Sequence, residues 1–465
     1  MYDQIGGGFH RYSVDERWIV PHFEKMSYDN AGLLGNYLRA YQVTGHEFFR
    51  EISLGILSFV DTVLSHPEGG FFASQDADYS LEDDGDYFTW TLDELKAALD
   101  PQEAEAAAQF YHVEERGEMH HNPAKNVLFI DQPVEAIAAR MKLTPEEVKQ
   151  ILARAKTKML AARAKRQTPF VDPAIYSAWN GMIISALLEA YKVLGLAGAR
   201  DRALVTLDLV LEKAYDPARG LAHSLLRVPS ESSSPPLNFG FRISEFGFLD
   251  DQVFMITALL DAYEVTGNPA YFDRALELME TTVRRFWDDK DGGFFDTAKD
   301  LDQRQGRLQA PHKPFQDSPT PAGNSVAALV LDRLAALAER PDFREKAETV
   351  LSLLAGKAGD YGLFAATFGL ALTHHRRAPV QIVVVGKPDD DRTAALLNAA
   401  HQTPRAGKRV FAFAPEVVKN GNLPAGLGAT LRHLPLDGNP LALVCVGTSC
   451  KPPVTTPDAL TEALK

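Results

Sequence analysis

A six-residue motif that closes an apolar helical stretch occurs three times in this chain. It reads Ala-Tyr-Gln-Val-Thr-Gly at 40–45, Ala-Tyr-Lys-Val-Leu-Gly at 190–195 and Ala-Tyr-Glu-Val-Thr-Gly at 262–267. A second helical stretch follows each copy, and then a turn of glycine with an aromatic or apolar residue. Because self-similarity at a nearly constant spacing is typical of repeat architectures, the sequence predicts helical hairpins packed side by side, as a ring or a solenoid.

The glycine that ends each motif is a typical helix stop signal, because glycine adopts the left-handed conformation at low cost. The second helices of the three hairpins are predicted at 47–64, 200–214 and 270–286. The same scheme predicts further helices at 92–110, 135–165, 325–338, 343–354 and 363–374. The first glycine-aromatic turn, at 7–9, has no helical pair before it, so we expect the chain to start inside a repeat.

The character of the sequence changes after Pro379. Strands are predicted for the β-branched and apolar runs at 380–385, 410–414 and 441–446, and helices for 391–400 and 457–464. We therefore expect a mainly α protein with two domains, a helical-hairpin (α/α) barrel at 1–376 and a small α/β region at 377–465.

The composition excludes several classes of partner. Lys and Arg number 48 against 62 Asp and Glu, and the resulting net charge of -14 argues against nucleic acid or an anionic membrane. No apolar run reaches the roughly 18 residues that span a bilayer, and the first residues lack a signal-peptide pattern. Two cysteines, Cys445 and Cys450, are too few for a disulfide framework, so we expect a cytoplasmic protein. Whether the two thiols bond stays open.

Binding chemistry is expected at the glycine-aromatic turns and at the starts of the first helices. The segment 6–34 mixes aromatic and ionisable side chains without a helix or strand period until about residue 31. The helix starts read Tyr28-Asp29-Asn30, Ala178-Trp179-Asn180, Asp250-Asp251-Gln252 and Gly323-Asn324-Ser325. Residues of these types are also ordinary helix N-caps, and that alternative stays open. If the hairpins form a ring, these side chains converge at one cavity mouth.

Carboxylates beside aromatic rings are typical of sugar sites, because one acid transfers a proton while the rings stack on the sugar. Histidines could serve as acid–base groups near neutral pH. No His-x-x-x-His pattern or cysteine cluster indicates a metal site. The acidic run at 76–86 lacks the glycine register of a calcium loop. We therefore expect neither a metal nor a cofactor.

Several blocks of sequence carry a resemblance to a known family. They are Asp3-Gln-Ile-Gly-Gly-Gly-Phe-His-Arg-Tyr-Ser13, Pro21-His-Phe-Glu-Lys-Met26, Ser74-Gln-Asp-Ala-Asp78, Trp179-Asn-Gly181, Leu249-Asp-Asp251 and Gly292-Gly-Phe-Phe295. On these blocks the chain resembles the thioredoxin-domain-containing proteins related to spermatogenesis-associated protein 20, over essentially its whole length. The resemblance implies a six-hairpin (α/α) toroid like those of N-acylglucosamine 2-epimerase and several glycosidases, with a small C-terminal α/β flank.

In that family a thioredoxin-like domain precedes the toroid. This sequence lacks the matching segment and a leading hairpin, so we expect a toroid that is incomplete at the N-terminus. A thioredoxin-like protein could then act as a partner in trans.

Two readings of the function follow. The first is carbohydrate chemistry, either epimerisation or isomerisation with His22 as the proton-transfer group, or hydrolysis with Asp29 and Asp251 as the carboxylate pair. The residues expected to bind a sugar or glycan are Arg11, Tyr12, Trp18, Glu24, Asn30, Asp76, Asp78, Trp179, Asn180, Asp250 and Asn324. The alternative is a non-catalytic module that binds a protein or a glycan, a remnant of a thioredoxin-domain-containing protein.

Overall fold

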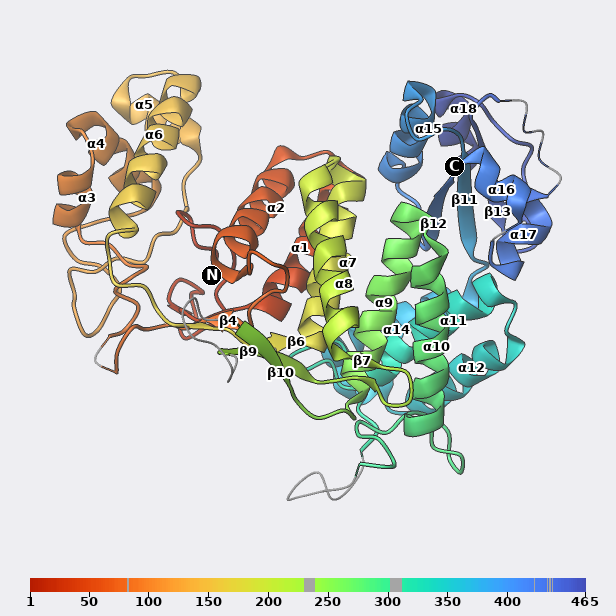
Figure 1. Ribbon diagram of the computed structural model, residues 1–465. Coiled ribbons are helices and arrows are strands. Elements are labelled where there is room, and N and C mark those ends of the chain that lie inside the picture. Colours follow the sequence, from red (N-terminus) through yellow and green to blue (C-terminus); the bar gives the residue numbers. More distant parts are fainter. Residues whose placement is uncertain are drawn as a thin grey trace. The chain divides into compact units, whose positions relative to one another are not determined.

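Most of the chain lies in helices, and its parts are shown in Figure 1 in the colours of the sequence. The computed structural model describes residues 1–81, 83–229, 239–301, 312–421, 423–432, 434, 436 and 438–465. The chain divides into two units. Unit 1 comprises Met1–Tyr37, His46–Pro67 and Phe71–Pro173, and unit 2 comprises Leu38–Gly45, Glu68–Gly70 and Ala174–Lys465. The mainly α class predicted from the repeat is confirmed.

Unit 1 begins with an irregular segment that holds three two-residue strands. The strands β1 (Tyr12–Ser13) and β2 (Pro21–His22) pair antiparallel. The strand β3 (Lys25–Met26) joins β4 (Ser74–Gln75) and β5 (Val171–Asp172) in a three-stranded sheet. These short ladders attach the N-terminal segment to parts of unit 1 that lie far away in the sequence.

A buried ionic cluster fixes the same segment. Nζ of Lys25 donates to Oδ2 of Asp3 at 2.6 Å and to the carbonyl oxygen of Gly7 at 2.9 Å. Nη1 of Arg163 donates to Oδ1 of Asp3 at 2.9 Å. The exposed fractions of the three side chains are between 1% and 5%. Because a buried carboxylate is tolerated only when it is paired, this cluster determines where the first residues of the chain lie.

The helices of unit 1 confirm the predicted helical regions, but two of these regions are each divided. The first hairpin consists of α1 (Ser27–Thr44), whose last turns belong to unit 2, and α2 (Glu47–Phe59), which ends in a π-helical turn (Val60–Leu64). The stretch 92–110 forms α3 (Leu92–Ala98) and α4 (Pro101–Phe110), and 135–165 forms α5 (Val134–Met141) and α6 (Pro145–Arg163).

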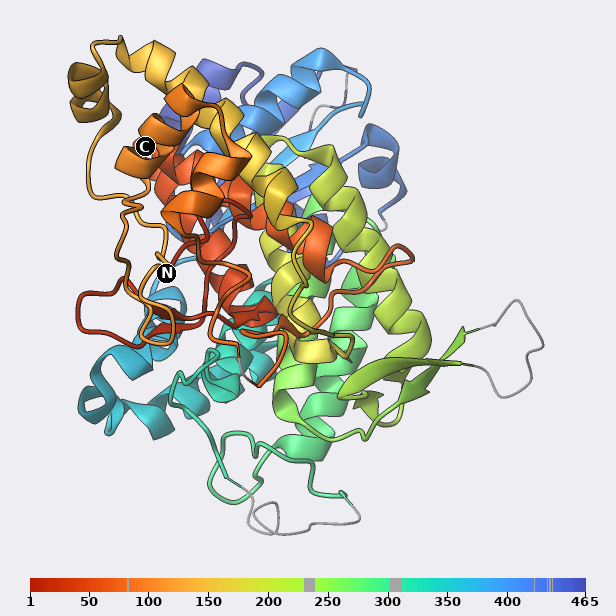
Figure 2. The same cartoon turned by 90° about the vertical axis from the view of Figure 1, so that its left-hand side faces the viewer.

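The two divisions have a local cause. Pro101 and Pro145 occupy first helical positions, where proline is tolerated, and the residues before them are extended. Lys142 ends α5 in the left-handed conformation. The helices α3 to α6 gather into one cluster, which faces the viewer in Figure 2.

Unit 2 contains the hairpins that the repeat predicted. They are α7 (Ser177–Leu194) with α8 (Ala197–Ala214), α9 (Leu249–Thr266) with α10 (Pro269–Phe286), and α11 (Gly323–Ala338) with α12 (Pro341–Ala355). The first helices pack in chain order, α7 against α9 and α9 against α11. The stop signals are confirmed at Gly195 and Gly267, which adopt left-handed φ angles of 71° and 65°.

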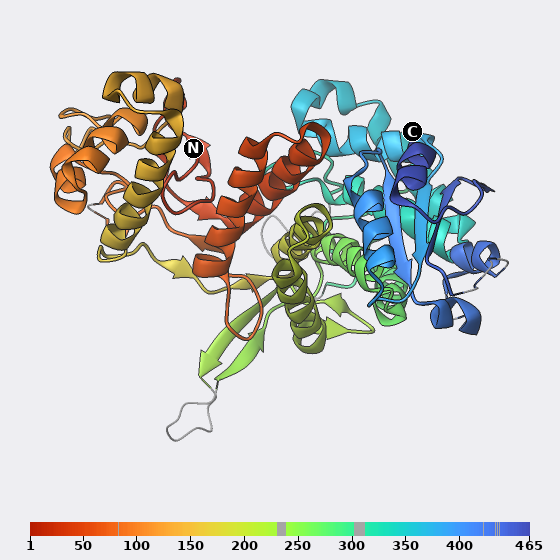
Figure 3. The ribbon, with the colours of Figure 1, turned by 90° about the horizontal axis from the view of Figure 1, so that it is seen from above.

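Shorter elements complete the helical part of unit 2. The helix α13 (Ala358–Tyr361) and a 3-10 turn (Gly362–Ala365) lead into α14 (Ala366–Arg376), which packs against α11. The strands β7 (Tyr215–Asp216) and β8 (Gly220–Leu221) form a small ladder. A sheet that the sequence analysis did not predict joins β6 (Ile175–Tyr176), β9 (Ser224–Pro229) and β10 (Phe239–Ile243), and β9 and β10 lie beside α8 (Figure 3).

The last ninety residues or so of unit 2 form the α/β elements that the sequence predicted. The sheet has the order β12 (Lys408–Phe413), β11 (Val380–Val385), β13 (Leu441–Val446) and β14 (Ser449–Cys450), with β11 parallel to β12 and antiparallel to β13. The helices are α15 (Asp391–Gln402), α16 (Pro415–Asn420), α17 (Ala425–Leu431) and α18 (Pro457–Leu464). The domain boundary at 376/377 stays a prediction.

Two side-chain features stabilise the α/β part of unit 2. Cys445 and Cys450 form a disulfide across β13 and β14, a pairing that the sequence left open. Tyr263 on α9 contacts Phe411 and Phe413 on β12, with ring centroids 5.9 and 6.2 Å apart. None of the helices in the described residues is long and apolar enough to cross a membrane.

Candidate functional site

The start of α9 carries a carboxylate that links two other elements of unit 2. Oδ1 of Asp251 accepts the backbone N–H of Ala178 at 3.1 Å, at the start of α7. Oδ2 of Asp251 lies 3.0 Å from Nδ1 of His223, in the connection between β8 and β9. The Asp251 side chain is 1% exposed, whereas 40% of the His223 side chain is exposed. Asp251 therefore caps a neighbouring helix and holds an accessible imidazole in one orientation.

The backbone of His223 is fixed at the same place. Its N–H donates to the carbonyl oxygen of Glu245 at 2.8 Å, and its carbonyl oxygen accepts the N–H of Ser177 at 2.9 Å. Burial favours the neutral ring, but the hydrogen bond and charge of Asp251, with the charges of Asp250 and Glu245, outweigh burial and raise the pKa of His223. An oriented histidine with a buried carboxylate behind it is the arrangement that acid–base catalysis uses.

Asp250, the neighbour of Asp251, is a carboxyl group that can hold a proton near neutral pH. Burial, followed by the charges of Asp251 and Asp296, raises its pKa to about 7. A Cβ at Gly323, the first residue of α11, would lie only 2.3 Å from Oδ1 of Asp250. The glycine therefore makes room for this carboxyl group.

Asp296 reaches the same region from the glycine-aromatic turn after α10. Its carbonyl oxygen accepts the N–H of Leu249 at 3.0 Å, so its backbone is tied to the start of α9. Oδ1 of Asp296 accepts the N–H of His312 at 3.0 Å. Its charge contributes to the raised pKa of Asp250.

Aromatic rings surround the imidazole. Tyr176 lies with its ring centroid 4.5 Å from that of Trp179 and 5.0 Å from that of His223. Phe248 contacts the other side of the imidazole at 4.8 Å. All four residues are only partly buried. This row of rings beside carboxylates is suited to the C–H face and the hydroxyl groups of a sugar.

The amides predicted to bind substrate are instead bonded to the backbone. Asn324 accepts the N–H of Phe294 at 2.8 Å and donates to its carbonyl oxygen at 2.9 Å. Asn30 brackets Phe9 in the same way, at 2.8 and 3.1 Å, and Gln252 brackets Leu221, at 2.9 and 3.1 Å. Each amide is 1% exposed or less. One amide per repeat thus clamps a glycine turn to a helix start.

Asn180 occupies the equivalent position of α7. Its Nδ2 donates to the carbonyl oxygen of Tyr176 at 2.9 Å, and its side chain is buried. We therefore propose that these amides position the helix starts and do not touch a ligand. The sequence signal was present, since each amide stands three residues after the start of its helix or one residue after it, but the backbone partners of Asn30, Gln252 and Asn324 lie 21, 31 and 30 residues away in the chain.

Unit 1 holds a second group of predicted site residues. Nη1 of Arg11 lies 3.0 Å from Oε2 of Glu24, and Nε2 of His22 lies 3.6 Å from the same oxygen. Tyr12 stacks on His22 with ring centroids 4.9 Å apart. Burial raises the pKa of Asp29 to about 6, against the opposing charge of Arg11. Five of the predicted residues therefore lie together within unit 1, through electrostatic interactions or ring stacking: Arg11, Tyr12, His22, Glu24 and Asp29.

The roles of the remaining predicted site residues stay predictions. Asp29 lies in unit 1 and Asp251 in unit 2, so their role as one carboxylate pair stays a prediction. Trp18 is 69% exposed on the loop between β1 and β2. Asp76 is exposed and accepts the N–H of Ala77 at 3.1 Å.

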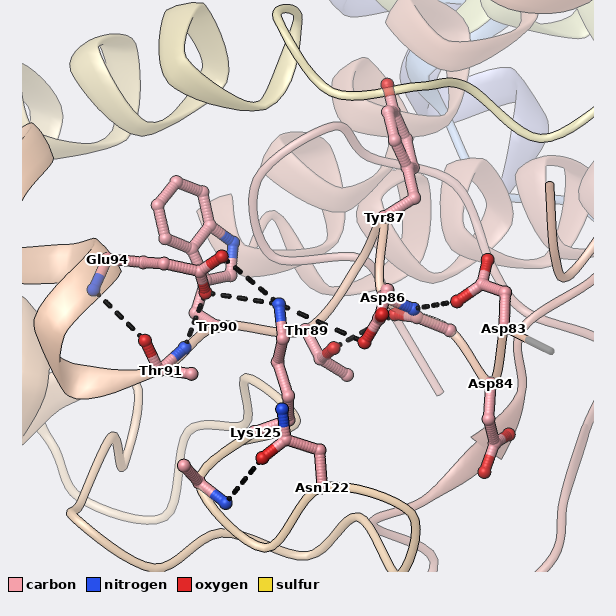
Figure 4. A network of polar contacts seen from close by, with 12 residues as sticks. Asp83, Asp84, Asp86, Tyr87, Thr89, Trp90, Thr91, Glu94, Asn122 and Lys125 are labelled. Atoms are coloured by element: carbon pink, nitrogen blue, oxygen red, sulfur yellow. Dashed lines mark hydrogen bonds and ion pairs between the residues drawn. The ribbon is translucent and has the colours of Figure 1, made fainter. Parts of the chain in front are cut away.

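The acidic run at 76–86 is organised by its own backbone and by Lys125, as Figure 4 shows in part. Asp83 accepts the N–H groups of Tyr79 and Asp86, at 3.0 and 2.8 Å. Nζ of Lys125 lies 3.1 Å from Oε1 of Glu94 and 3.9 Å from Oδ1 of Asp86. Glu82 lies outside the described residues. Within the part of the chain that the structure describes, no group of three or more His, Cys, Asp or Glu side chains could hold a metal ion.

Sequence reasoning missed His223, an accessible histidine of unit 2. It lies in a short connection without helical or strand period, and its partner Asp251 is 28 residues away. The only local signal was its place one residue after the glycine turn Gly220-Leu221-Ala222. His10, which follows the first turn Gly8-Phe9, corresponds to Ala222 and not to His223, because Asn30 and Gln252 bracket Phe9 and Leu221. It is buried, with Nδ1 at 2.7 Å from the carbonyl oxygen of Phe23.

Comparisons with known proteins identify relatives of this chain by sequence. No family model matches the chain. It is 31% identical to human spermatogenesis-associated protein 20 over 99% of this chain and 60% of that protein. It is 30% identical to the mouse protein of that name over 86% of this chain and 52% of the relative. The chain is thus a homologue of these proteins, as its motifs indicated, and spans between about half and three fifths of their length.

Solved structures show only a distant likeness. D-mannose isomerase is matched with a TM-score of 0.41 and 14% identity, over 80% of this chain and 66% of that one. Cellobiose 2-epimerase from Spirochaeta thermophila gives 0.38 and 12%, over 76% and 79% of the two chains. The GH76 alpha-mannanase BT2949 from Bacteroides thetaiotaomicron gives 0.40 and 11%, over 81% and 73%. At these values the likeness carries no argument about the function of this chain.

Proposed function

We propose that this chain is a carbohydrate-active protein and that His223 and Asp250 of unit 2 transfer protons on a sugar, with Asp251 positioning His223. The observation that carries the proposal is the pairing of a buried Asp251 with a half-exposed His223, 3.0 Å apart, beside a carboxyl group whose pKa is about 7. An oriented imidazole and a carboxyl group whose pKa is raised to about 7 supply both a base and an acid in one place.

The reaction class that fits is epimerisation or isomerisation of an open-chain sugar. Neutral His223 removes the proton from the carbon beside the carbonyl group, and the electrons of that C–H bond form the double bond of an enediol. Protonated Asp250 gives its proton to the carbonyl oxygen. For an epimer, the enediol turns its opposite face to the imidazolium of His223, which returns a proton to the same carbon, while the carboxylate of Asp250 takes back the proton on the first oxygen. For an isomer, the imidazolium gives the proton to the former carbonyl carbon, while the carboxylate of Asp250 takes the proton of the neighbouring hydroxyl group, whose oxygen becomes the new carbonyl oxygen. Each positioned proton transfer contributes about 10²- to 10⁴-fold in rate.

Asp251 acts through His223 in this proposal. Its negative charge stabilises the imidazolium that forms when His223 takes the proton, and its hydrogen bond fixes which ring nitrogen faces the substrate. Tyr176, Trp179 and Phe248 would hold the sugar by its C–H surface.

A glycoside hydrolase remains the second candidate, because a carboxyl group protonated near pH 7 is also what a glycosidase acid requires. It would need a second carboxylate as a nucleophile or base. Asp296 is a candidate, because its charge contributes to the raised pKa of Asp250. A module that binds a glycan or protein without reaction is the remaining alternative.

The test is product analysis by NMR with the full chain in D₂O. Neutral aldoses, ketoses and disaccharides are supplied in turn. Deuterium at the carbon beside the carbonyl group, with a new epimer or isomer, would support the proposal. Release of reducing ends without exchange would favour the hydrolase, and binding without turnover would favour the module. His223→Gln should lower the exchange rate by about 10²-fold or more, whereas the matched control His46→Gln, an exposed histidine of unit 1 at the start of α2, should not change it.

A further inference from the structure

A pocket of about 210 Å³ lies in unit 1, apart from the groups used above in unit 2. Three segments build it, the loop between β1 and β2, the residues after β4, and residues 118–120. Its floor is apolar, because Phe23, Ala77 and Met119 are buried and belong to one core cluster. By liquid volume the space corresponds to about seven water molecules, enough for a monosaccharide or a short amine.

The polar lining of this pocket is acidic. Four carboxylates, Asp15, Asp78, Asp84 and Glu118, line it together with His22 and His120, and no Lys or Arg does so among the described residues. Oδ1 of Asp78 accepts the N–H of Gly85 at 2.9 Å, and Oε2 of Glu118 accepts the N–H of Val127 at 3.1 Å. The backbone therefore fixes one oxygen of each carboxylate, so that both groups are oriented before any ligand arrives.

The loop that forms one wall is held rigid and strained. Oδ1 of Asp15 accepts the N–H groups of Ile19 and Val20, at 2.9 and 2.8 Å, and Oδ2 accepts the N–H of Arg17 at 3.2 Å. Trp18 adopts a left-handed φ of 62° although it is large and 69% exposed. The left-handed φ and the exposed indole ring of Trp18 each cost stability, and strain of this kind gathers at ligand-binding loops.

We propose that this pocket binds a protonated amine carried on a compact, partly apolar body, such as an amino sugar or a short alkylamine. The apolar floor accepts the carbon skeleton, and the free oxygens of Asp78 and Glu118 accept the ammonium hydrogens. Charge-assisted hydrogen bonds to fixed carboxylates favour a cation, and the absence of a lining Lys or Arg disfavours acids and phosphates. The pocket, its apolar floor and the strained wall carry this inference together, and it does not rest on the proposed sugar chemistry of unit 2.

The test is calorimetric titration of the full chain with two pairs of probes, each pair matched in size: glucosamine with glucose, and butylamine with butanoate. The two amines should bind and the other two should not, and binding should weaken as salt rises. Glu118→Gln and Asp78→Asn should each weaken amine binding by about tenfold. Glu135→Gln, which removes the same charge from the exposed surface of α5, is the matched control and should bind as the wild type does.

Several outcomes would overturn the proposal. They are no amine binding up to concentrations on the order of 10 mM, equal binding of butanoate, or amine affinities unchanged in both pocket variants. Preference for glucosamine over butylamine would identify an amino sugar as the natural ligand class, and the reverse would identify a simple amine. Asp251→Asn, which disables the proposed proton transfer in unit 2, should leave amine binding unchanged, so the two proposals can fail separately.

Discussion

Replacing Asp3 by Asn should destabilise unit 1 far more than any other change to its ionic cluster. The carboxylate of Asp3 accepts four hydrogen bonds, from Lys25, from Arg163 and from the backbone N–H groups of Ile5 and Gly6, at 2.6, 2.9, 3.0 and 3.0 Å. It is also the only negative partner that the described residues give these two buried cations. Asn would leave both cations without a counter-charge, and a buried charge that loses its partner costs about 3 to 5 kcal/mol.

Lys25→Met is the informative comparison, because it removes one of two cations. Asp3 and Arg163 then remain as a balanced pair, and the main loss is the hydrogen bond to the carbonyl oxygen of Gly7. An unsatisfied buried acceptor costs about 1 to 3 kcal/mol, so the cost of this variant should be smaller than that of Asp3→Asn.

The pH dependence provides a second check. Burial lowers the pKa of Lys25 from 10.5 to about 8, although Asp3 opposes the shift. Between these values the unfolded chain binds more protons than the folded one, so the contribution of Lys25 makes the protein more stable as pH rises from about 8 toward 10.5. The difference of 2.5 pKa units corresponds to at most about 3 kcal/mol. Lys25→Met should lose this gain.

Hydrogen exchange followed by mass spectrometry measures both effects locally, because the peptides that cover residues 1–30 report opening of this segment even if unit 2 stays folded. Urea unfolding at pH 7 and pH 9 gives the corresponding free energies. If Asp3→Asn costs no more than Lys25→Met, or if the wild type and Lys25→Met respond equally to pH, the assignment of the cluster's charges is wrong.

Three further predictions concern single sites. Asp251→Asn should lower the pKa of His223, because the ring loses its negative partner, and NMR titration of the imidazole should detect it; an unchanged pKa would contradict the pairing. Gly323→Ala should leave a folded protein whose sugar turnover falls by about 10²-fold, since the new Cβ would displace Asp250, while circular dichroism checks the fold; full turnover would remove Asp250 from the mechanism. Trp18→Gly should be more stable to urea than Trp18→Ala by about 1 kcal/mol, because only glycine relieves the left-handed strain; equal stabilities would show that the loop is unstrained.

The homology to spermatogenesis-associated protein 20 covers nearly the whole chain, yet the name of those relatives describes no chemistry. The proposals made above therefore rest on this chain's own geometry. They separate a proton-transfer site in unit 2 from an amine pocket in unit 1, and each can be tested without the other.

The sequence by itself determined the elements that depend on neighbours along the chain. The apolar period of the repeat and the glycine stops gave the hairpins α7/α8 and α9/α10, and the β-branched run at 380–385 gave β11. Where a local signal competed with the period, the local signal prevailed. Pro101 and Pro145 divided two predicted helices, because proline at a first helical position requires an extended residue before it.

Tertiary structure alone decided which side chains meet. Asp251 was recognised from its helix start, but its partner His223 was not, because hydrogen bonds between segments far apart in the chain leave no periodic trace in the sequence. For the same reason the sequence did not show that the fold brings Asn30 and Asn324 each to a distant glycine turn, where both ends of the amide bond to the backbone; their role toward a substrate stays a prediction. Helix and strand formation is local physics, whereas the partners of a buried polar group are fixed only when the chain has folded around it.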